Sequence, residues 1–426
     1  MATLTTPPKL RELQLALYQR AKKEPNFRAY ALYDKLYRDD VLAHAYALVR
    51  ANGGAPGVDG MSLEDIEAQG REALLQELKE ELRTKTYRPG PVRRVEIPKL
   101  SGGTRPLGIP NVRDRVVQTA VKLLLEPLFE ADFDRDSFGF RPKRNAHQAI
   151  EAVREELANG MHWIIDADIS KYFDTIPHDR LMKAVAERVV DGAMLALVKM
   201  FLEASVVDDR DGGRPRKNRQ GTPQGGVISP LLANIYLNLL DRNFRRQSEK
   251  HQLRGRLVRY ADDFVLLVPR RPDRELAWVK QLMERLGLQL HREKTRVLDA
   301  TAEGINFLGH EIRWRGGKTY LDVSRKTAKR IRDEVRRRTS RPQDSLETVV
   351  GELNKYIIGA RNYFRGVRRR TLAKLDYFVA QRLARWWARK HAQKRPAWSL
   401  VWEGPLRQNL TRWYPQGRQH PSRNAR

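Results

Sequence analysis

The sequence predicts an α+β protein in which a body of helices and strands is followed by a helical, strongly basic segment. Residues 92–110 and 256–268 each contain two strand-like runs separated by turn residues, a pattern typical of antiparallel β-hairpins. Longer stretches around them repeat apolar residues at the spacing of amphipathic helices. From about residue 325 the strand-like runs stop and arginine-rich helical patterns take over. This change of composition is the best candidate for a domain boundary.

The N-terminal part alternates helices and loops. Residues 9–50 favour helix, and the dense turn cluster Asn52-Gly-Gly-Ala-Pro-Gly-Val-Asp-Gly60 must form a loop. The capping box Ser62-Leu-Glu-Asp65 begins a helix over 62–85. After the first hairpin the patterns predict helices at 112–130 and 145–158, a strand at 163–169, a helix at 178–205, a polar loop at about 207–220, a helix ending near 243, a helix at 272–286, and strands at 294–299 and 305–314.

The charge of the chain restricts its partners. Lys and Arg number 81 against 52 Asp and Glu, which gives a net charge of +29 in 426 residues. Such an excess indicates a polyanionic partner, either nucleic acid or an anionic membrane surface. Membrane is the weaker of the two, because no uninterrupted apolar stretch of about 18 residues occurs and the N-terminus lacks the apolar core of a secretory signal. The absence of Cys excludes disulfides and thiolate zinc sites.

Two acidic motifs carry the candidate chemistry. In the predicted strand 163–169, Asp166 and Asp168 share one face because side chains alternate along a strand. The turn of the second hairpin holds Asp262 and Asp263, although a turn is also an ordinary place for Asp. If Asp168 lies beside this turn, the carboxylates form a cluster that needs divalent cations, and Mg²⁺ suits oxygen ligands and substrate phosphates. Two such ions, about 3.5–4 Å apart, would activate a 3′-hydroxyl and stabilise a leaving pyrophosphate.

Basic and glycine-rich loops complete this picture. Lys99 and Arg105 flank the tip of the first hairpin and could close over a triphosphate, although an exposed basic hairpin is the plainer interpretation. The loop Gly221-Thr-Pro-Gln-Gly-Gly226 lacks the Lys-Ser/Thr of a P-loop. Its glycines are interpreted as letting the backbone approach a base pair or a template strand.

These motifs, in this order, resemble the reverse transcriptases encoded by bacterial group II introns. The resemblance covers nearly the whole chain and rests on Gly54-Ala-Pro-Gly-Val-Asp-Gly60, Ile97-Pro-Lys-Leu-Ser-Gly-Gly-Thr-Arg105-Pro-Leu-Gly-Ile-Pro110, Ser137-Phe-Gly-Phe-Arg-Pro142, Asp168-Ile-Ser-Lys-Tyr-Phe-Asp174, Gly221-Thr-Pro-Gln-Gly-Gly226 with Ser229-Pro-Leu-Leu-Ala-Asn234, Tyr260-Ala-Asp-Asp263, Leu286-Gly-Leu-Gln-Leu-His-Arg-Glu-Lys-Thr295 and Phe307-Leu-Gly309. It implies a right-hand polymerase fold with fingers, a palm containing an antiparallel sheet, and a helical thumb.

The resemblance also implies roles for individual residues. Asp168, Asp262 and Asp263 would be the catalytic metal ligands, with the backbone carbonyl of Ile169 as a further ligand to two Mg²⁺ ions, for which Mn²⁺ could substitute. Phe173 would exclude a ribose 2′-hydroxyl, so that the substrates are dNTPs. The remaining residues that it implies are Lys99 and Arg105 at the triphosphate, Gln224 beside the incoming nucleotide, Lys294 as a proton donor and Arg141 near the templating base.

The basic C-terminal segment resembles the thumb and maturase domain. It interleaves aromatics with arginines, of which Arg361, Arg365, Arg368, Arg369 and Arg370 are the expected RNA contacts, whereas most of the aromatics are expected in the helix cores. The expected divisions are a helical extension (1–50), fingers and palm (51–324), thumb or maturase domain (325–405) and a basic tail (406–426). Because the chain ends soon after Trp413 and lacks Cys, no zinc nuclease is expected.

The predicted function is RNA-directed DNA synthesis from a DNA primer on an RNA template, together with binding of intron RNA and target DNA, in the cytoplasm at the bacterial nucleoid. Two alternatives stay open. One is a free-standing relative that serves host repair, phage defence or spacer acquisition. The other is an RNA-binding splicing cofactor with a vestigial polymerase site, against which the intact aspartates argue.

Overall fold

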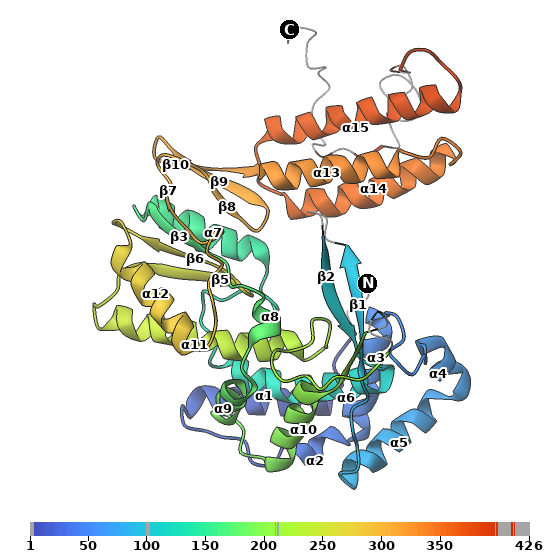
Figure 1. Cartoon of the computed structure of the whole chain (residues 1–426), viewed down its shortest axis with the longest axis vertical. Coiled ribbons are helices and arrows are strands. Elements are labelled where there is room, and N and C mark those ends of the chain that lie inside the picture. Colours follow the sequence, from blue (N-terminus) through green and yellow to red (C-terminus); the bar gives the residue numbers. More distant parts are fainter. Residues whose placement is uncertain are drawn as a thin grey trace. The chain divides into compact units, whose positions relative to one another are not determined.

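The computed structural model describes residues 4–98, 103–208, 210, 213–396, 398, 410, 411 and 413. The chain divides into two compact units (Figure 1). The first unit comprises Met1–Ala152 and Trp163–Val297, and the second comprises Val153–His162 and Leu298–Arg426. No helix among the described residues is both long and apolar enough to cross a membrane.

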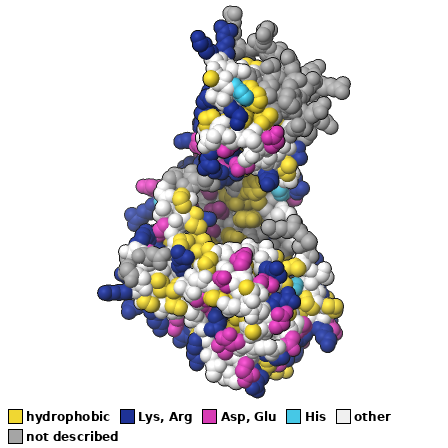
Figure 2. Space-filling model, turned by 90° about the vertical axis from the view of Figure 1, so that its right-hand side faces the viewer, with side chains coloured by type: hydrophobic (Ala, Val, Ile, Leu, Met, Phe, Trp, Pro, Cys, Tyr) yellow, Lys and Arg dark blue, Asp and Glu magenta, His cyan; other side chains and the backbone are white. Residues whose placement is uncertain are grey.

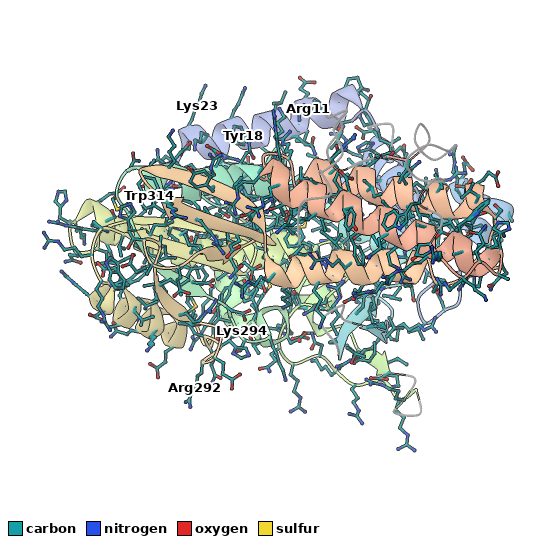
Figure 3. The ribbon with its side chains drawn as sticks, turned by 90° about the horizontal axis from the view of Figure 1, so that it is seen from above. Arg11, Tyr18, Lys23, Arg292, Lys294 and Trp314 are labelled. Atoms are coloured by element: carbon teal, nitrogen blue, oxygen red, sulfur yellow. The ribbon has the colours of Figure 1, made fainter. Side chains whose placement is uncertain are left out.

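The N-terminal helices pack around one buried helix. Helix α6 (Val112–Glu130) is buried on most of its surface, and both α1 (Pro8–Lys23) and α3 (Asp39–Asn52) pack against it. The outer side of α1 faces solvent, where Arg11, Tyr18 and Lys23 project (Figure 3). The other helices of this region are α2 (Tyr33–Leu36), α4 (Leu63–Gln69) and α5 (Arg71–Arg83).

Two predicted helices are each interrupted. The stretch 62–85 begins at the capping box of Ser62 and Asp65 as predicted, but Gly70 takes a φ of 95° and separates α4 from α5. The stretch 178–205 forms α9 (His178–Ala186) and α10 (Gly192–Glu203). Asp191 causes the second break, because its carboxylate caps α10 and also accepts hydrogen bonds from the backbone of Leu32 and Tyr33.

A four-stranded sheet of order β5-β6-β3-β7 belongs to the first unit except for the last two residues of β7, which are assigned to the second. Its members are β3 (Trp163–Ala167), the hairpin of β5 (Arg256–Tyr260) and β6 (Asp263–Val268), and β7 (Arg296–Asp299). The apolar faces of these strands are fully buried, as the runs of β-branched and large apolar residues predict. The helices that accompany this sheet are α7 (Ala146–Ala158), α8 (Tyr172–Thr175), α11 (Ser229–Glu249) and α12 (Asp273–Arg285).

The first predicted hairpin also forms a sheet. Strand β1 (Val92–Pro98) pairs antiparallel with β2 (Thr104–Ile109) and parallel with β4 (Val206–Asp208). The prediction of a polar loop throughout 207–220 was therefore wrong at its start. Its residues become a strand only because β1, more than 100 positions upstream, supplies hydrogen-bonding partners.

The second unit combines a small sheet with three long helices among the described residues. Strands β8 (Ile305–Phe307), β9 (His310–Arg315) and β10 (Lys318–Val323) form an antiparallel sheet. The helices are α13 (Arg325–Arg338), α14 (Leu346–Tyr363) and α15 (Arg369–Lys390), and Ser324 and Ser345 cap the first two. Trp386 is fully buried, as expected for an aromatic of the helix core. The change of composition near 325 falls at the start of α13, whereas the C-terminal segment of the second unit already begins at Leu298.

Candidate polymerase active site

The central sheet brings the acidic motifs together. In the antiparallel register Ala167 of β3 pairs with Phe264 of β6, and Tyr260 pairs with Asp263 across the hairpin. Asp168 follows Ala167 directly, so it reaches the hairpin turn at the level of Asp263. Segments about 94 positions apart in the sequence thus meet at one end of the sheet, as the sequence predicts.

The carboxylates at this end repel one another. Partial enclosure by the protein, together with the charges of Asp262, Asp168 and Asp166, raises the pKa of Asp263 to about 7. Burial and then Asp168 raise the pKa of Asp262. Burial raises the pKa of Asp166 to about 6, although Arg296 lies 3.7 Å from its carboxylate and opposes the rise. The positive charges of the surrounding protein therefore do not fully balance the negative charge of this cluster.

Lys294 supplies part of the missing positive charge. Its Nζ lies 3.1 Å from Oδ2 of Asp168, and it stands on the loop between α12 and β7, near Arg292 (Figure 3). Backbone hydrogen bonds place this loop: His291 N donates to Asp168 O and Ser170 N donates to Gln289 O, each at 2.8 Å. In that antiparallel arrangement the carbonyl of Ile169 points away from the loop, toward the edge occupied by β6.

The potential ligand atoms are of the type that a hard divalent cation prefers. They consist of carboxylate oxygens with an available backbone carbonyl, and their unbalanced charge favours a cation. Within the described parts of the chain, however, no three His, Asp or Glu side chains converge closely enough to hold a metal ion as they stand. Binding a cation would thus require the carboxylates to move closer together and Lys294 to move away from Asp168.

A buried ion pair supports the acidic turn from behind. Arg259, which is fully buried, pairs with Asp241 of α11 at 2.6 Å. Its Nη1 also donates to Asn234 Oδ1 at 3.0 Å and to the carbonyl of Ala261 at 2.9 Å. Ala261 directly precedes Asp262 and takes a left-handed φ of 58°. Arg259 therefore holds the turn in a conformation that Ala rarely adopts alone.

Phe173 stands beside the glycine-rich loop. Thr222 N donates to Phe173 O at 2.7 Å, and a Cβ on Gly221 would lie 2.5 Å from that same oxygen. At the other end of the loop a Cβ on Gly225 would lie 2.4 Å from Gly108 O of β2. These two glycines let the loop lie against α8 and β2, and the interpretation that the loop backbone approaches a nucleic acid stays a prediction.

Gln224 and Arg105 belong to the same neighbourhood of the first unit. Gly108 N donates to Gln224 O at 2.5 Å, so the backbone of Gln224 is attached to β2. Arg105 lies exposed on β2, opposite Ile97 in the register of the hairpin. Lys99, the other predicted triphosphate contact, lies outside the described residues.

Comparison with known proteins identifies the family. The family described as reverse transcriptase (RNA-dependent DNA polymerase) matches residues 97–312, which is half of the chain. The family described as the group II intron, maturase-specific domain matches residues 328–403. The chain belongs to the group II intron-type reverse transcriptases. Its activity is RNA-directed DNA polymerisation, a metal-dependent reaction, and its domains bind an RNA template and intron RNA.

Two curated relatives of this reverse transcriptase illustrate the similarity. Protein YkfC of Escherichia coli (strain K12) is 36% identical over 342 residues, which cover 71% of this chain and 87% of YkfC. The group II intron-encoded protein LtrA of Lactococcus lactis subsp. cremoris is 31% identical over 351 residues, which cover 68% of this chain but only 57% of LtrA. A telomerase from Candida albicans, solved with a telomeric RNA fragment, covers 75% of this chain and 63% of that chain at 15% identity and a TM-score of 0.42.

Arg141 is bound within the protein in the structure of this reverse transcriptase. Its side chain is buried, with the residue only 7% exposed, and it pairs with Glu130 at 2.7 Å. It also donates to the carbonyls of Ser137 and Asp134. These bonds attach the guanidinium to the protein interior, and the placement of Arg141 near the templating base stays a prediction.

The predicted RNA-binding arginines all lie in the second unit. Arg365, Arg369 and Arg370 are exposed between α14 and the start of α15, and Arg361 is half-buried on α14. Arg368 forms an ion pair with Asp322 of β10, so part of its charge is already used within the unit. Figure 2 shows Lys and Arg side chains on both units of the face that it presents.

Sequence reasoning missed the support of the catalytic turn. Arg259 and Asp241 appeared only as residues of a predicted strand and a predicted helix, and Asn234 only as the last residue of a family motif with no role assigned. A signal was available: Asn234 and Asp241 are seven positions apart, two turns along the same face of the helix, among the mostly apolar residues Leu231–Leu240. Polar residues on a buried helix face require a partner, and Arg259 is that partner.

Proposed function

We propose that Asp168, Asp262 and Asp263, with the carbonyl of Ile169, hold two Mg²⁺ ions, for which Mn²⁺ can substitute. The enzyme would then add dNTPs to the 3′-hydroxyl of a DNA primer on an RNA template. The observation that carries this proposal is that strand pairing brings the three aspartates to one end of the sheet, where burial and then the neighbouring carboxylates raise the pKa of Asp263 to about 7. A group of carboxylates that destabilises itself in this way is suited to cations.

The chemistry of the site divides among the chain's own residues. Bound divalent ions would lower the pKa of the 3′-hydroxyl and neutralise the departing pyrophosphate. Arg105, with Lys99, would contact the triphosphate of the dNTP from the first hairpin. Lys294, whose side chain is 58% exposed, stands where it can pass a proton to the leaving group once it releases Asp168. Gln224 would lie beside the incoming nucleotide.

Phe173 is the proposed determinant of sugar selection. Replacing it by Ala should open the space beside the 2′-carbon, so that ribonucleotides are incorporated on a primed RNA template. The loop bond between Thr222 N and Phe173 O involves only backbone and survives the substitution. We expect the dNTP-to-rNTP ratio of kcat/KM to fall by about 10²-fold or more, since a steric clash of a few kcal/mol disappears.

Primer extension with single nucleotides measures this ratio. The adjacent Tyr172→Phe variant is the matched control. It removes a hydroxyl that donates to Ala233 O inside the core, and it leaves the aromatic ring in place. Sugar discrimination unchanged in Phe173→Ala would refute the assignment. Absence of DNA synthesis by the unmodified protein on any RNA template would refute the proposed function itself.

The predicted RNA-binding arginines of the second unit are the proposed contacts to intron RNA and to target DNA. Affinity for structured RNA should fall steeply with salt, by roughly 10³-fold between 50 and 200 mM, because phosphate contacts release counterions. The double variant Arg365→Ala/Arg370→Ala should reduce the slope of log Kd against log salt by about two. The double variant Arg11→Ala/Arg20→Ala, at exposed positions of α1, serves as a charge-matched control. A flat salt response would contradict binding through phosphates.

A further inference from the structure

Phe140 is a bulky aromatic residue that is both exposed and left-handed in its backbone. Its side chain is 53% exposed, and its φ of 56° lies in the left-handed region. A bulky residue is strained there, because its Cβ approaches the backbone, whereas Gly or Asn adopts the same conformation at lower cost. An exposed ring also gains little from burial. Neither the local backbone nor core packing therefore accounts for Phe at this position.

The neighbours of Phe140 enforce this conformation. Before it, the carbonyl of Gly139 accepts a hydrogen bond from Asn234 Nδ2 at 2.8 Å. After it, the buried Arg141 donates to Ser137 O at 2.5 Å and pairs with Glu130. Both flanking residues are attached to the interior, so the chain cannot relax between them. A strained conformation that its surroundings determine from both sides is a signature of functional positions.

Phe140 also lies beside the catalytic turn. Phe138 N donates to Arg259 O at 2.8 Å and Arg259 N donates to Asp136 O at 2.9 Å, so this segment runs alongside β5. A Cβ on Gly139 would lie 2.3 Å from Ala261 N. The residue before Phe140 thus contacts the residue before Asp262. The backbone that carries the exposed ring therefore lies against the turn at which the proposed DNA synthesis takes place.

We propose that the ring of Phe140 packs against a nucleotide of the primer–template duplex and so positions the primer end at the catalytic turn. A flat, apolar ring is suited to the faces of bases and sugars, and such contacts do not depend on sequence. That is what a polymerase requires, since every nucleotide of a template passes this point. The inference rests on the proposed DNA synthesis at this turn.

The test separates the ring from the backbone that carries it. Phe140→Gly removes the ring and relieves the left-handed strain. We expect the Kd for an RNA–DNA heteroduplex to rise at least about five-fold, while the melting temperature of the protein stays unchanged or rises. Phe140→Tyr keeps the ring and should bind within about two-fold of the unmodified protein. Fluorescence anisotropy of a labelled primer annealed to RNA, without dNTPs and with a chelator, measures this affinity.

Two further variants make the result decisive. Tyr30→Gly removes another exposed aromatic, 71% exposed, from the loop between α1 and α2 and should leave the affinity unchanged. Phe140→Leu keeps apolar volume without a flat ring, and it should weaken binding even if the Gly variant folds poorly. Equal affinities of the Phe, Tyr, Leu and Gly forms would overturn the proposal, as would an effect confined to self-association of the protein. The assay measures binding and not catalysis. Repeating the comparison in an Asp262→Ala background therefore tests the role of the Phe140 ring separately from the proposed DNA synthesis.

Discussion

Replacing Asp262 by Ala should abolish DNA synthesis and leave the fold intact. We expect kcat/KM for dNTP incorporation on a primed RNA template to fall by about 10³-fold or more, because one carboxylate of the proposed metal site is removed. Thermal stability should not fall. Asp262 repels Asp263, whose pKa the cluster raises to about 7, so that removal of Asp262 relieves charge repulsion in the folded state.

Loss of activity without loss of stability distinguishes a catalytic carboxylate from a structural one. Primer extension gives the rate, and thermal unfolding gives the stability of the same preparation. Asp299→Ala is the matched control: Asp299 ends β7 in the same sheet, and its carboxylate accepts hydrogen bonds from Thr301 in its own turn. Its loss should leave the rate nearly unchanged. Robust synthesis by Asp262→Ala would exclude the proposed metal site, whatever the stability.

Replacing Asp241 by Ala should produce the largest loss of stability. The variant leaves the guanidinium of Arg259 buried without its carboxylate partner, and breaking a buried pair in this way costs about 3–5 kcal/mol. Activity should fall as well, since Arg259 also holds the carbonyl of Ala261, next to Asp262. Chemical denaturation measures the first effect, and primer extension under stabilising conditions measures the second.

A double variant separates the two roles of the pair. Arg259→Met/Asp241→Leu replaces the buried charges by apolar side chains, which is often neutral for stability. We expect stability to recover while synthesis stays impaired, because the donors to Asn234 and Ala261 are gone. Glu80→Ala, which removes the exposed partner of Arg83, should change stability little. Unaltered stability of Asp241→Ala would show that the pair contributes nothing to the turn.

Local patterns predicted most of the elements. The helix expected over 112–130 is α6 with the same bounds, and both hairpins form where turn residues interrupt β-branched runs. The errors occurred where distant segments decide. Asp191 breaks a continuous helical pattern because the segment containing Leu32 and Tyr33 needs an acceptor. Strand β4 exists because β1 offers an edge.

The candidate site shows the same division. The sequence by itself determined which chemistry the protein carries: the aspartates of two motifs, their spacing and the basic surface around them are properties of local segments. Only the tertiary structure decided that Arg141 is buried against Glu130, that Gly221 and Gly225 lie against protein, that Arg259 and Asp241 support the turn, and that the ring of Phe140 stays exposed. The physical reason is that burial and pairing depend on which residues, distant in sequence, occupy the neighbouring volume.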